Sequence, residues 1–295
     1  MAHDHAPPSD LGPAFRWAVG LNVTYVAVEA AAASLTGSLA LFADAAHNLT
    51  DVAGLLIAWF AASLANRSGT MSFTWGLGRA TILAAMLNAT AILIGVGIVI
   101  WEAASRLTTP VEIPGLTVMI VALLGIGVNA GSALLFMKSR KGDLNAKGAF
   151  LHMATDAGVS GAVVLAAGGI MLTNWQWLDS ATAIAVSVVI AFSAWGLMRE
   201  SLELFLDGVP SGVDRHAVAA WIGAQNGVTG VHDLHIWALS TTRTALAAHV
   251  VRTGADQDDF IDFVADELEH EFGISHVTLQ IESYPCERAQ QCLVE

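Results

Sequence analysis

Residues 37–51 read GSLALFADAAHNLTD, and this stretch places three ionisable side chains inside an apolar run. The spacings of three and four residues put Asp44, His47 and Asp51 on one face of a helix. The run 39–64 contains no other charged residue and exceeds the length of about 20 residues that a bilayer requires. A carboxylate at bilayer depth costs roughly 3 kcal/mol on insertion scales. Ionisable residues in such a span therefore indicate a functional site.

The pattern recurs in a second apolar run, residues 148–173, which contains His152 and Asp156 in HMATD. Two such pairs on separate spans are costly unless they face each other or a water-filled cavity. Facing each other, they supply two imidazole nitrogens and two carboxylate oxygens, a tetrahedral set that suits zinc. Imidazole also suits cobalt, nickel and iron, whereas an all-oxygen set would favour manganese or magnesium. Both ligand types lose protons when they bind a metal, so metal–proton exchange needs no additional residue.

A structural interpretation of these residues is the alternative, because one buried His or Asp in a span can simply form an interhelical hydrogen bond. Two repeated pairs favour a metal or proton pathway over this alternative. Asp44, and Glu29 in the preceding apolar run, fit hydrogen bonding within the bundle or ion access better than direct ligation.

The composition of the whole chain is that of a polytopic membrane protein. Of its 295 residues, 55% are hydrophobic and 13% are charged, about half the charged fraction of a soluble domain. The mean hydropathy is +0.59. We expect a disordered N-terminus (residues 1–13) and an α-helical membrane domain (residues 14–206) with six transmembrane helices. The helices are expected at residues 14–36, 39–64, 79–104, 114–137, 148–173 and 176–199.

The distribution of basic residues predicts the orientation of the spans. Arg106 is the one basic residue of the membrane domain that would lie on the outer side. Eight would lie on the opposite side, which is then the cytoplasmic side of the inner membrane. These are Arg16, Arg67, Arg79, Lys138, Arg140, Lys141, Lys147 and Arg199. Both termini are therefore expected in the cytoplasm, as an even number of spans requires.

The C-terminal part of the chain is polar and acidic. Residues 207–295 carry 4 basic and 14 acidic residues, a net charge of −10, against −3 for residues 1–206. Such a charge suits cations and excludes nucleic acid as a partner. The two cysteines, Cys286 and Cys292, do not form a disulfide framework, which agrees with a cytosolic location.

Local patterns in this part alternate between helix and strand. The order α-β-β-α-β predicts a ferredoxin-like α+β domain over residues 207–285, followed by a tail (residues 286–295). Asp214 is the expected N-cap of the first helix. The expected elements span residues 214–225, 228–240, 245–252, 256–271 and 274–283.

Four histidines and one glutamate of this domain form a second candidate metal site: His232, His235, His249, His276 and Glu282. Imidazole groups in an acidic background favour a metal, while isolated strand histidines are usually surface residues, and the two interpretations balance evenly. Side chains alternate along an uninterrupted strand, so we expect His232 and His235 on opposite faces.

The quoted motifs resemble those of the cation diffusion facilitator family, close to its zinc-transporting branch. Besides GSLALFADAAHNLTD and HMATD, the runs VHDLHIW (residues 231–237) and HVTLQIE (residues 276–282) carry the resemblance, which covers nearly the whole chain. It implies a homodimeric metal/proton antiporter with a transport site at His47, Asp51, His152 and Asp156. It also implies a cytoplasmic site at His232, His249 and Glu282. Gln280 stands where some members carry a His, which weighs against a second cytoplasmic ion.

The sequence thus predicts a membrane antiporter, not an enzyme, that exports Zn²⁺ in exchange for protons, with Cd²⁺, Co²⁺ or Fe²⁺ as further cargo. An intramembrane zinc protease would require an HExxH motif, which is absent from the sequence. A metal sensor would need ligands only in the polar domain, so the ionisable residues within the apolar runs argue against it. A tight four-ligand site would hold ions too long for the flux of a passive channel, which argues against that alternative.

Overall fold

The computed structural model describes residues 13–136, 144–254 and 256–284. Within its helices, the description excludes the side chains of residues 13–19, 22, 51–52, 54–56, 58–59, 135–136 and 144–152. The predicted terminal segments, residues 1–13 and 286–295, lie outside the described residues, apart from Pro13.

Six long helices correspond to the six predicted apolar stretches. They are α1 (Pro13–Thr36), α2 (Leu39–Ala65), α3 (Ala80–Arg106), α4 (Gly115–Phe136), α5 (Leu144–Thr173) and α6 (Trp177–Phe205). Among the described residues, four helical segments are long and apolar enough to cross a membrane. They are Ala80–Arg106, Gly115–Leu134, Met153–Thr173 and Trp177–Phe205.

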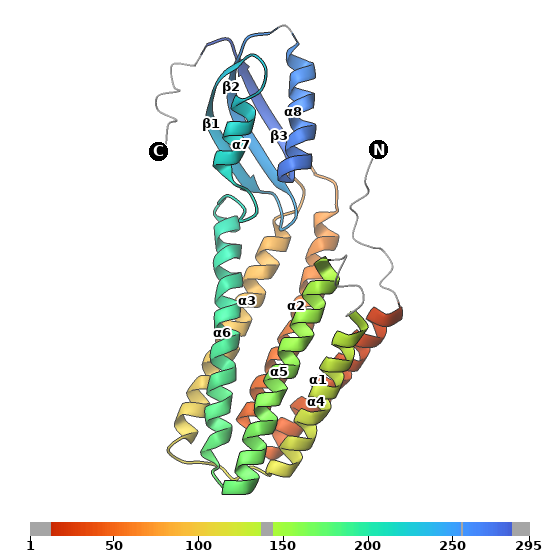
Figure 1. Cartoon of the computed structure of the whole chain (residues 1–295), viewed down its shortest axis with the longest axis vertical. Coiled ribbons are helices and arrows are strands. Elements are labelled where there is room, and N and C mark those ends of the chain that lie inside the picture. The colour runs from red at the N-terminus through yellow and green to blue at the C-terminus, as the bar shows by residue number, and fades with distance from the viewer. Residues whose placement is uncertain (1–12, 137–143, 255, 285–295) are drawn as a thin grey trace. The chain divides into compact units, whose positions relative to one another are not determined.

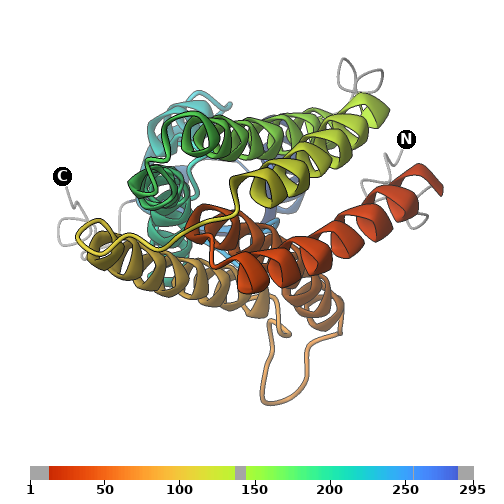
Figure 2. The same ribbon diagram turned by 90° about the horizontal axis from the view of Figure 1, so that it is seen from below.

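The chain divides into two compact units, and the first comprises residues 1–53 and 90–194. In this unit α4 lies between α1 and α5 (Figure 2). Its core consists of aliphatic side chains such as Leu41, Val118 and Val163. Large apolar side chains such as Leu165 and Phe192 instead point outward and are at least three-quarters exposed. An apolar exterior of this kind suits a lipid environment.

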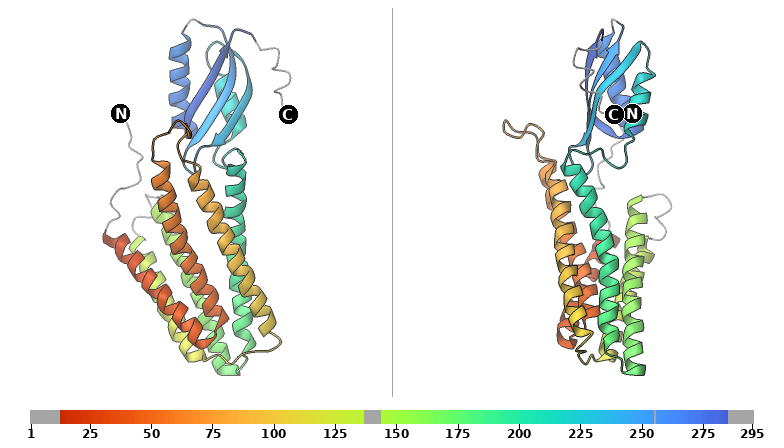
Figure 3. Two further views of the ribbon diagram at one scale, coloured as in Figure 1. Left: turned by 180° about the vertical axis from the view of Figure 1, so that it is seen from behind. Right: turned by 90° about the vertical axis from the view of Figure 1, so that its left-hand side faces the viewer.

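Three turns lie together at one end of the first unit, which we call the turn end (Figure 3). They are residues 37–38 between α1 and α2, residues 107–114 between α3 and α4, and residues 174–176 between α5 and α6. The Ile113 amide donates a hydrogen bond to Gln176 Oε1 at 2.9 Å and so joins two of these turns.

The second unit comprises residues 54–89 and 195–295 and contains a small α+β domain. The domain consists of α7 (Arg215–Gly223), β1 (Val228–Ala238), β2 (Thr244–Arg252), α8 (Gln257–Phe272) and β3 (Ile274–Glu282). The predicted order α-β-β-α-β is therefore confirmed. The predicted N-cap is also confirmed, because Asp214 accepts hydrogen bonds from the amides of His216 and Ala217.

The three strands form a mixed sheet in the order β1-β2-β3, with β1 antiparallel and β3 parallel to β2. Both α7 and α8 cover one face of this sheet (Figure 1). Buried side chains such as Val218, Leu246, Val250 and Val264 fill the space between the helices and the sheet. The opposite face of the sheet is not covered by α7 or α8, and it carries the histidines discussed below.

The buried end of β2 is tied to the start of α8 by Arg252. Its Nη2 atom lies 3.0 Å from Asp256 Oδ1, and its guanidinium group stacks on the Phe260 ring at 4.2 Å. A backbone amide hydrogen bond and the Arg252 guanidinium lower the pKa of the Asp256 carboxyl. The residue therefore carries a negative charge near the N-terminus of α8, where the helix dipole favours one.

Candidate metal sites

The first candidate site lies inside the first unit, where α2 and α5 bring His47 and Asp156 together. His47 Nε2 is 3.5 Å from Asp156 Oδ1, and the side chains are 16% and 4% exposed. These are the two members of the predicted transport site whose side chains are described. The side chains of Asp51 and His152 lie outside the described residues, although both positions are helical in α2 and α5.

A small cavity adjoins His47 between α2, α3 and α6. Its volume is about 20 Å³, and its lining includes Thr50, Val96, Ser187 and Ile190. This volume is comparable to the roughly 10–15 Å³ that one water molecule requires. The Ser187 hydroxyl is buried and has no hydrogen-bond partner among the described residues. The cavity therefore gives the His47 imidazole a partly polar surrounding within an apolar bundle.

Glu29 and Asp44 belong to a separate, fully buried hydrogen-bond network. The Tyr25 hydroxyl donates to Glu29 Oε1 at 2.7 Å. The Asn48 amide donates to Glu29 Oε2 at 3.2 Å and to Asp44 Oδ1 at 3.4 Å. The Ser160 hydroxyl donates to Asp44 Oδ2 at 2.9 Å. The two carboxyl groups thus link α1, α2 and α5, which agrees with the bundle hydrogen bonding expected for them.

The network depends on a close approach of α4. A Cβ atom on Gly125 would lie 2.2 Å from the Tyr25 hydroxyl oxygen and 3.0 Å from Ser160 Oγ. Only glycine leaves room for both hydroxyl groups at this point. Because Asn48 follows His47 directly in α2, the network also sets the rotation of α2 about its axis.

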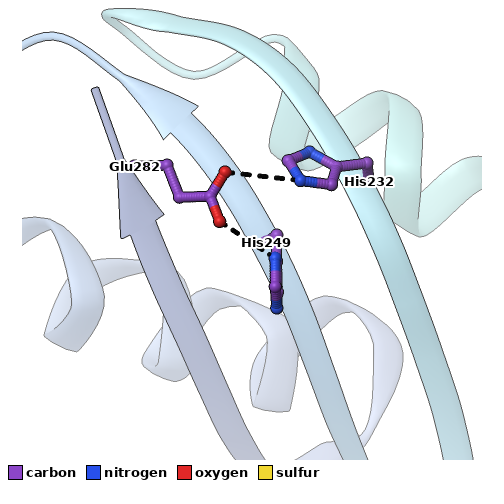
Figure 4. A group of neighbouring side chains, drawn as sticks. All are labelled: His232, His249 and Glu282. Atoms are coloured by element: carbon purple, nitrogen blue, oxygen red, sulfur yellow. Dashed lines mark ion pairs between the residues drawn. The ribbon is translucent and has the colours of Figure 1, made fainter. Parts of the chain in front are cut away.

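The second candidate site lies on the face of the sheet opposite α7 and α8, with one residue from each strand (Figure 4). His232 Nε2 is 3.4 Å from Glu282 Oε2, and His249 Nδ1 is 3.0 Å from Glu282 Oε1. Ligand atoms of all three residues lie within 4.8 Å of one another. Two imidazoles and a carboxylate form a donor set that suits zinc. In addition, Gln280 Nε2 donates a hydrogen bond to Glu282 Oε1 at 2.8 Å.

The strand register explains why these three residues meet. His232 is paired directly with His249 across β1 and β2. In the parallel pairing of β2 with β3, His249 lies opposite Gln280 and Val251 lies opposite Glu282. Directly paired residues point to the same face of a sheet. The three ligands predicted for the cytoplasmic site are therefore neighbours in the fold.

The expectation that His232 and His235 lie on opposite faces is wrong. His232 pairs with His249, but His235 pairs with Ala247, so β1 contains one residue more than β2 over this interval. This is a β-bulge, and Asp233 within it has a positive φ of 52°. The additional residue shifts the alternation by one position and brings both histidines to the same face.

The bulge adds a residue that the sequence patterns did not single out. Asp233 Oδ1 lies 2.8 Å from His235 Nε2, and Asp233 Oδ2 lies 3.6 Å from His249 Nε2. One sequence feature could have indicated the bulge. Aspartate is disfavoured within β-strands but tolerates left-handed backbone conformations, and Asp233 lies in the middle of a strand. His276 instead contacts the Trp75 ring edge-on, with a centroid distance of 4.7 Å.

Comparisons with known proteins cover both parts of the chain. The family model "Cation efflux transmembrane domain" matches residues 16–206, and "Cation efflux protein, cytoplasmic domain" matches residues 210–284. The metal cation efflux system protein CzcD of Cupriavidus metallidurans is 37% identical over 97% of this chain and 92% of its own length.

Two further relatives have similar coverage. The zinc transporter ZitB of Escherichia coli is 33% identical over 97% of this chain and 94% of its own length. The cadmium, cobalt and zinc/H(+)-K(+) antiporter of Bacillus subtilis is 32% identical over 88% of this chain and 85% of its own length. Family models match both parts of the chain and relatives match nearly its full length, so the chain belongs to the cation diffusion facilitator, or cation efflux, family, a family of membrane transporters and not of enzymes.

Proposed function

We propose that this protein exports divalent metal, Zn²⁺ foremost, from the cytoplasm in exchange for protons. The observation that carries the proposal is the 3.5 Å separation of His47 Nε2 and Asp156 Oδ1. Zinc bonds of about 2.0–2.1 Å at a tetrahedral angle separate two ligand atoms by about 3.3 Å. One ion could therefore bind both atoms after a small adjustment. Asp51 and His152, one helical turn away on the same two helices, would complete the tetrahedral set.

Proton exchange follows from the chemistry of these ligands. Imidazole and carboxylate groups bind zinc only when deprotonated, so the loading of an ion on the cytoplasmic side releases protons there. Once the site opens to the outside, protons rebind to the same groups and displace the metal. The four residues thus carry metal in one direction and protons in the other.

We assign six spans to residues 14–206, with both termini in the cytoplasm of a multi-pass inner-membrane protein, and a ferredoxin-like domain to residues 207–285. The ranges that the two family models match support this division. The names of the relatives support zinc, cadmium and cobalt as cargo. The proposal of Fe²⁺ as a further cargo rests only on the affinity of imidazole for this ion.

We further propose that the protein is a homodimer and that His232, His249 and Glu282 bind a regulatory metal ion. Two copies of a domain with a net charge of −10 repel each other. A cation bound on each domain would reduce this repulsion and bring the two domains together. Measuring the distance between the two cytoplasmic domains of the full-length protein with and without Zn²⁺ tests this idea. An unchanged distance would count against it.

The transport proposal is tested in proteoliposomes that contain dyes for Zn²⁺ and pH. Wild-type protein should move zinc and protons in opposite directions. Replacement of Asp51, His152 or Asp156 by Ala should abolish both fluxes in protein that is still folded. The matched control is His216→Ala, which removes an exposed imidazole at the start of α7. Zinc flux that survives loss of the membrane ligands would show that the two His–Asp pairs are structural and would contradict the proposed transport site.

A further inference from the structure

We infer that Asp179 of α6 is a positioning residue for the membrane metal site, because it holds the first turn of α2. This inference rests on the function proposed above. Asp179 is 3% exposed, and nothing in the metal–proton exchange requires its carboxylate. A buried carboxylate must nevertheless be compensated by hydrogen bonds or charge. Its partners belong to the start of α2.

Asp179 caps α2 from another helix. Its Oδ2 atom accepts a hydrogen bond from the Leu39 amide at 2.7 Å. Its Oδ1 atom accepts hydrogen bonds from the Ser38 hydroxyl and, at 3.4 Å, from the Ala40 amide. Caps are normally supplied by the residue that precedes the helix. Here the carboxylate comes from a residue about 140 positions later in the chain.

Ser38 completes the cap. Its hydroxyl oxygen accepts a hydrogen bond from the Leu41 amide at 3.2 Å, while the hydroxyl group donates a hydrogen bond to Asp179. The first three amides of α2 (residues 39–41) have no carbonyl partner within the helix, and Asp179 and Ser38 together satisfy all three. A carboxylate at this place is also favoured by the helix dipole. The start of α2 is therefore held at one position relative to α6.

Arg106 of α3 holds the other side of the same turn. Its Nη1 atom donates a hydrogen bond to the Gly37 carbonyl oxygen at 2.7 Å. Gly37 has a φ of +71°, and its amide bonds to the Ala33 carbonyl oxygen, which terminates α1. The turn between α1 and α2 is thus fixed by α3 through Arg106 and by α6 through Asp179.

The consequence for the metal site follows from helix geometry. His47 lies eight residues beyond Leu39, about 12 Å along α2. A slip of α2 by one residue would move His47 by about 1.5 Å and rotate it by about 100°. Metal–ligand distances tolerate deviations of only about 0.2 Å. The cap at the turn end therefore helps to maintain the position of His47 opposite Asp156.

The test measures zinc affinity by calorimetry on purified full-length protein. A His249→Ala background removes the cytoplasmic candidate site, so that the membrane site is observed. Asp179→Ala should weaken zinc binding about 10-fold, comparable to the smallest losses that follow when a residue that orients a metal ligand directly is removed. Asp179→Asn retains one carbonyl oxygen for the Leu39 amide and should recover part of the affinity. Ser180→Ala, a buried neighbour on α6, is the matched control and should bind zinc as the background does.

Each result has a defined meaning. Zinc affinity that is unchanged in folded Asp179→Ala protein, with only the unfolding temperature lowered, would overturn the inference and leave Asp179 a purely structural role. If Asp179→Ala does not fold, Ser38→Ala replaces it, and unchanged affinity in that variant would equally overturn the inference. Zinc binding in the background protein that survives Asp156→Ala would instead show that the proposed function itself is wrong.

Discussion

At the scale of single residues, His47 would determine the chemical character of the proposed membrane site. Its imidazole makes the predicted donor set one of two nitrogens and two oxygens, which suits zinc. His47→Asp would leave one nitrogen and three oxygens, a set that favours manganese more. We expect zinc flux to fall at least about 10-fold relative to manganese flux, because softer metals lose a preferred ligand. Competition between Zn²⁺ and Mn²⁺ in proteoliposomes measures this ratio, and an unchanged ratio would argue against ligation by His47.

Asn48 provides a second test at the same scale, on stability rather than transport. Its amide donates to both Glu29 and Asp44, so Asn48→Ala leaves two buried acceptors without this donor. We expect a loss of about 1–3 kcal/mol in the free energy of unfolding. Asn129→Ala is the control, because that buried amide has no hydrogen-bond partner in the part of the chain described. Denaturation in detergent compares the two variants, and equal losses would contradict the role given to the network.

At the scale of elements, the packing of α4 against α1 depends on Gly125. A methyl group there would collide with the Tyr25 hydroxyl, which is held by Glu29. We expect Gly125→Ala to destabilise the protein by about 1–3 kcal/mol through overpacking. Gly127→Ala on the same helix meets no atom within 4 Å and should be neutral or stabilising, because alanine favours helices. Thermal unfolding in detergent measures both variants, and similar midpoints would show that Tyr25 moves aside at little cost.

The bulge in β1 shows at the same scale how one residue can change a site. An uninterrupted strand would place His235 on the core side of the sheet, among Leu246 and Val250. The additional residue instead brings His235 to the face of the sheet opposite α7 and α8. There His235 contacts Asp233, whose carboxylate also contacts His249. The sheet face that carries the metal candidate thereby gains one carboxylate and one imidazole.

At the scale of the whole molecule, charge is expected to control association of the cytoplasmic domains. Residues 207–295 carry a net charge of −10, and screening by salt shortens the range of their repulsion to about 10 Å at 0.1 M. We expect the dimer dissociation constant of the full chain in detergent to decrease as salt rises from 0.05 to about 0.5 M. Zn²⁺ should produce the same change at low salt. Sedimentation measurements provide the constant, and a dimer that weakens with salt would contradict this expectation.

Local patterns explain how much of the fold and the sites was predictable. Apolar runs and the spacing of residues such as His47 and Asp156 reflect helix geometry, which depends on nearby residues alone. Strand alternation and the N-cap at Asp214 are local in the same sense. These patterns predicted the helices and the order α-β-β-α-β. The candidate set His232, His249 and Glu282 was implied by the family resemblance, and the sheet register brings these three residues together.

The tertiary structure alone decided which distant side chains meet. No local pattern connects Ser38 with Asp179, because their hydrogen bond spans 141 residues and exists only after α2 and α6 have packed. The same holds for Asp44 and Ser160, and for the bulge that aligns His235 with His232. The sequence by itself determined the long apolar helices, the acidic domain and the residue types of the candidate sites. Packing determined the partners, because burial of polar groups between helices requires complementary groups that only three-dimensional proximity can supply.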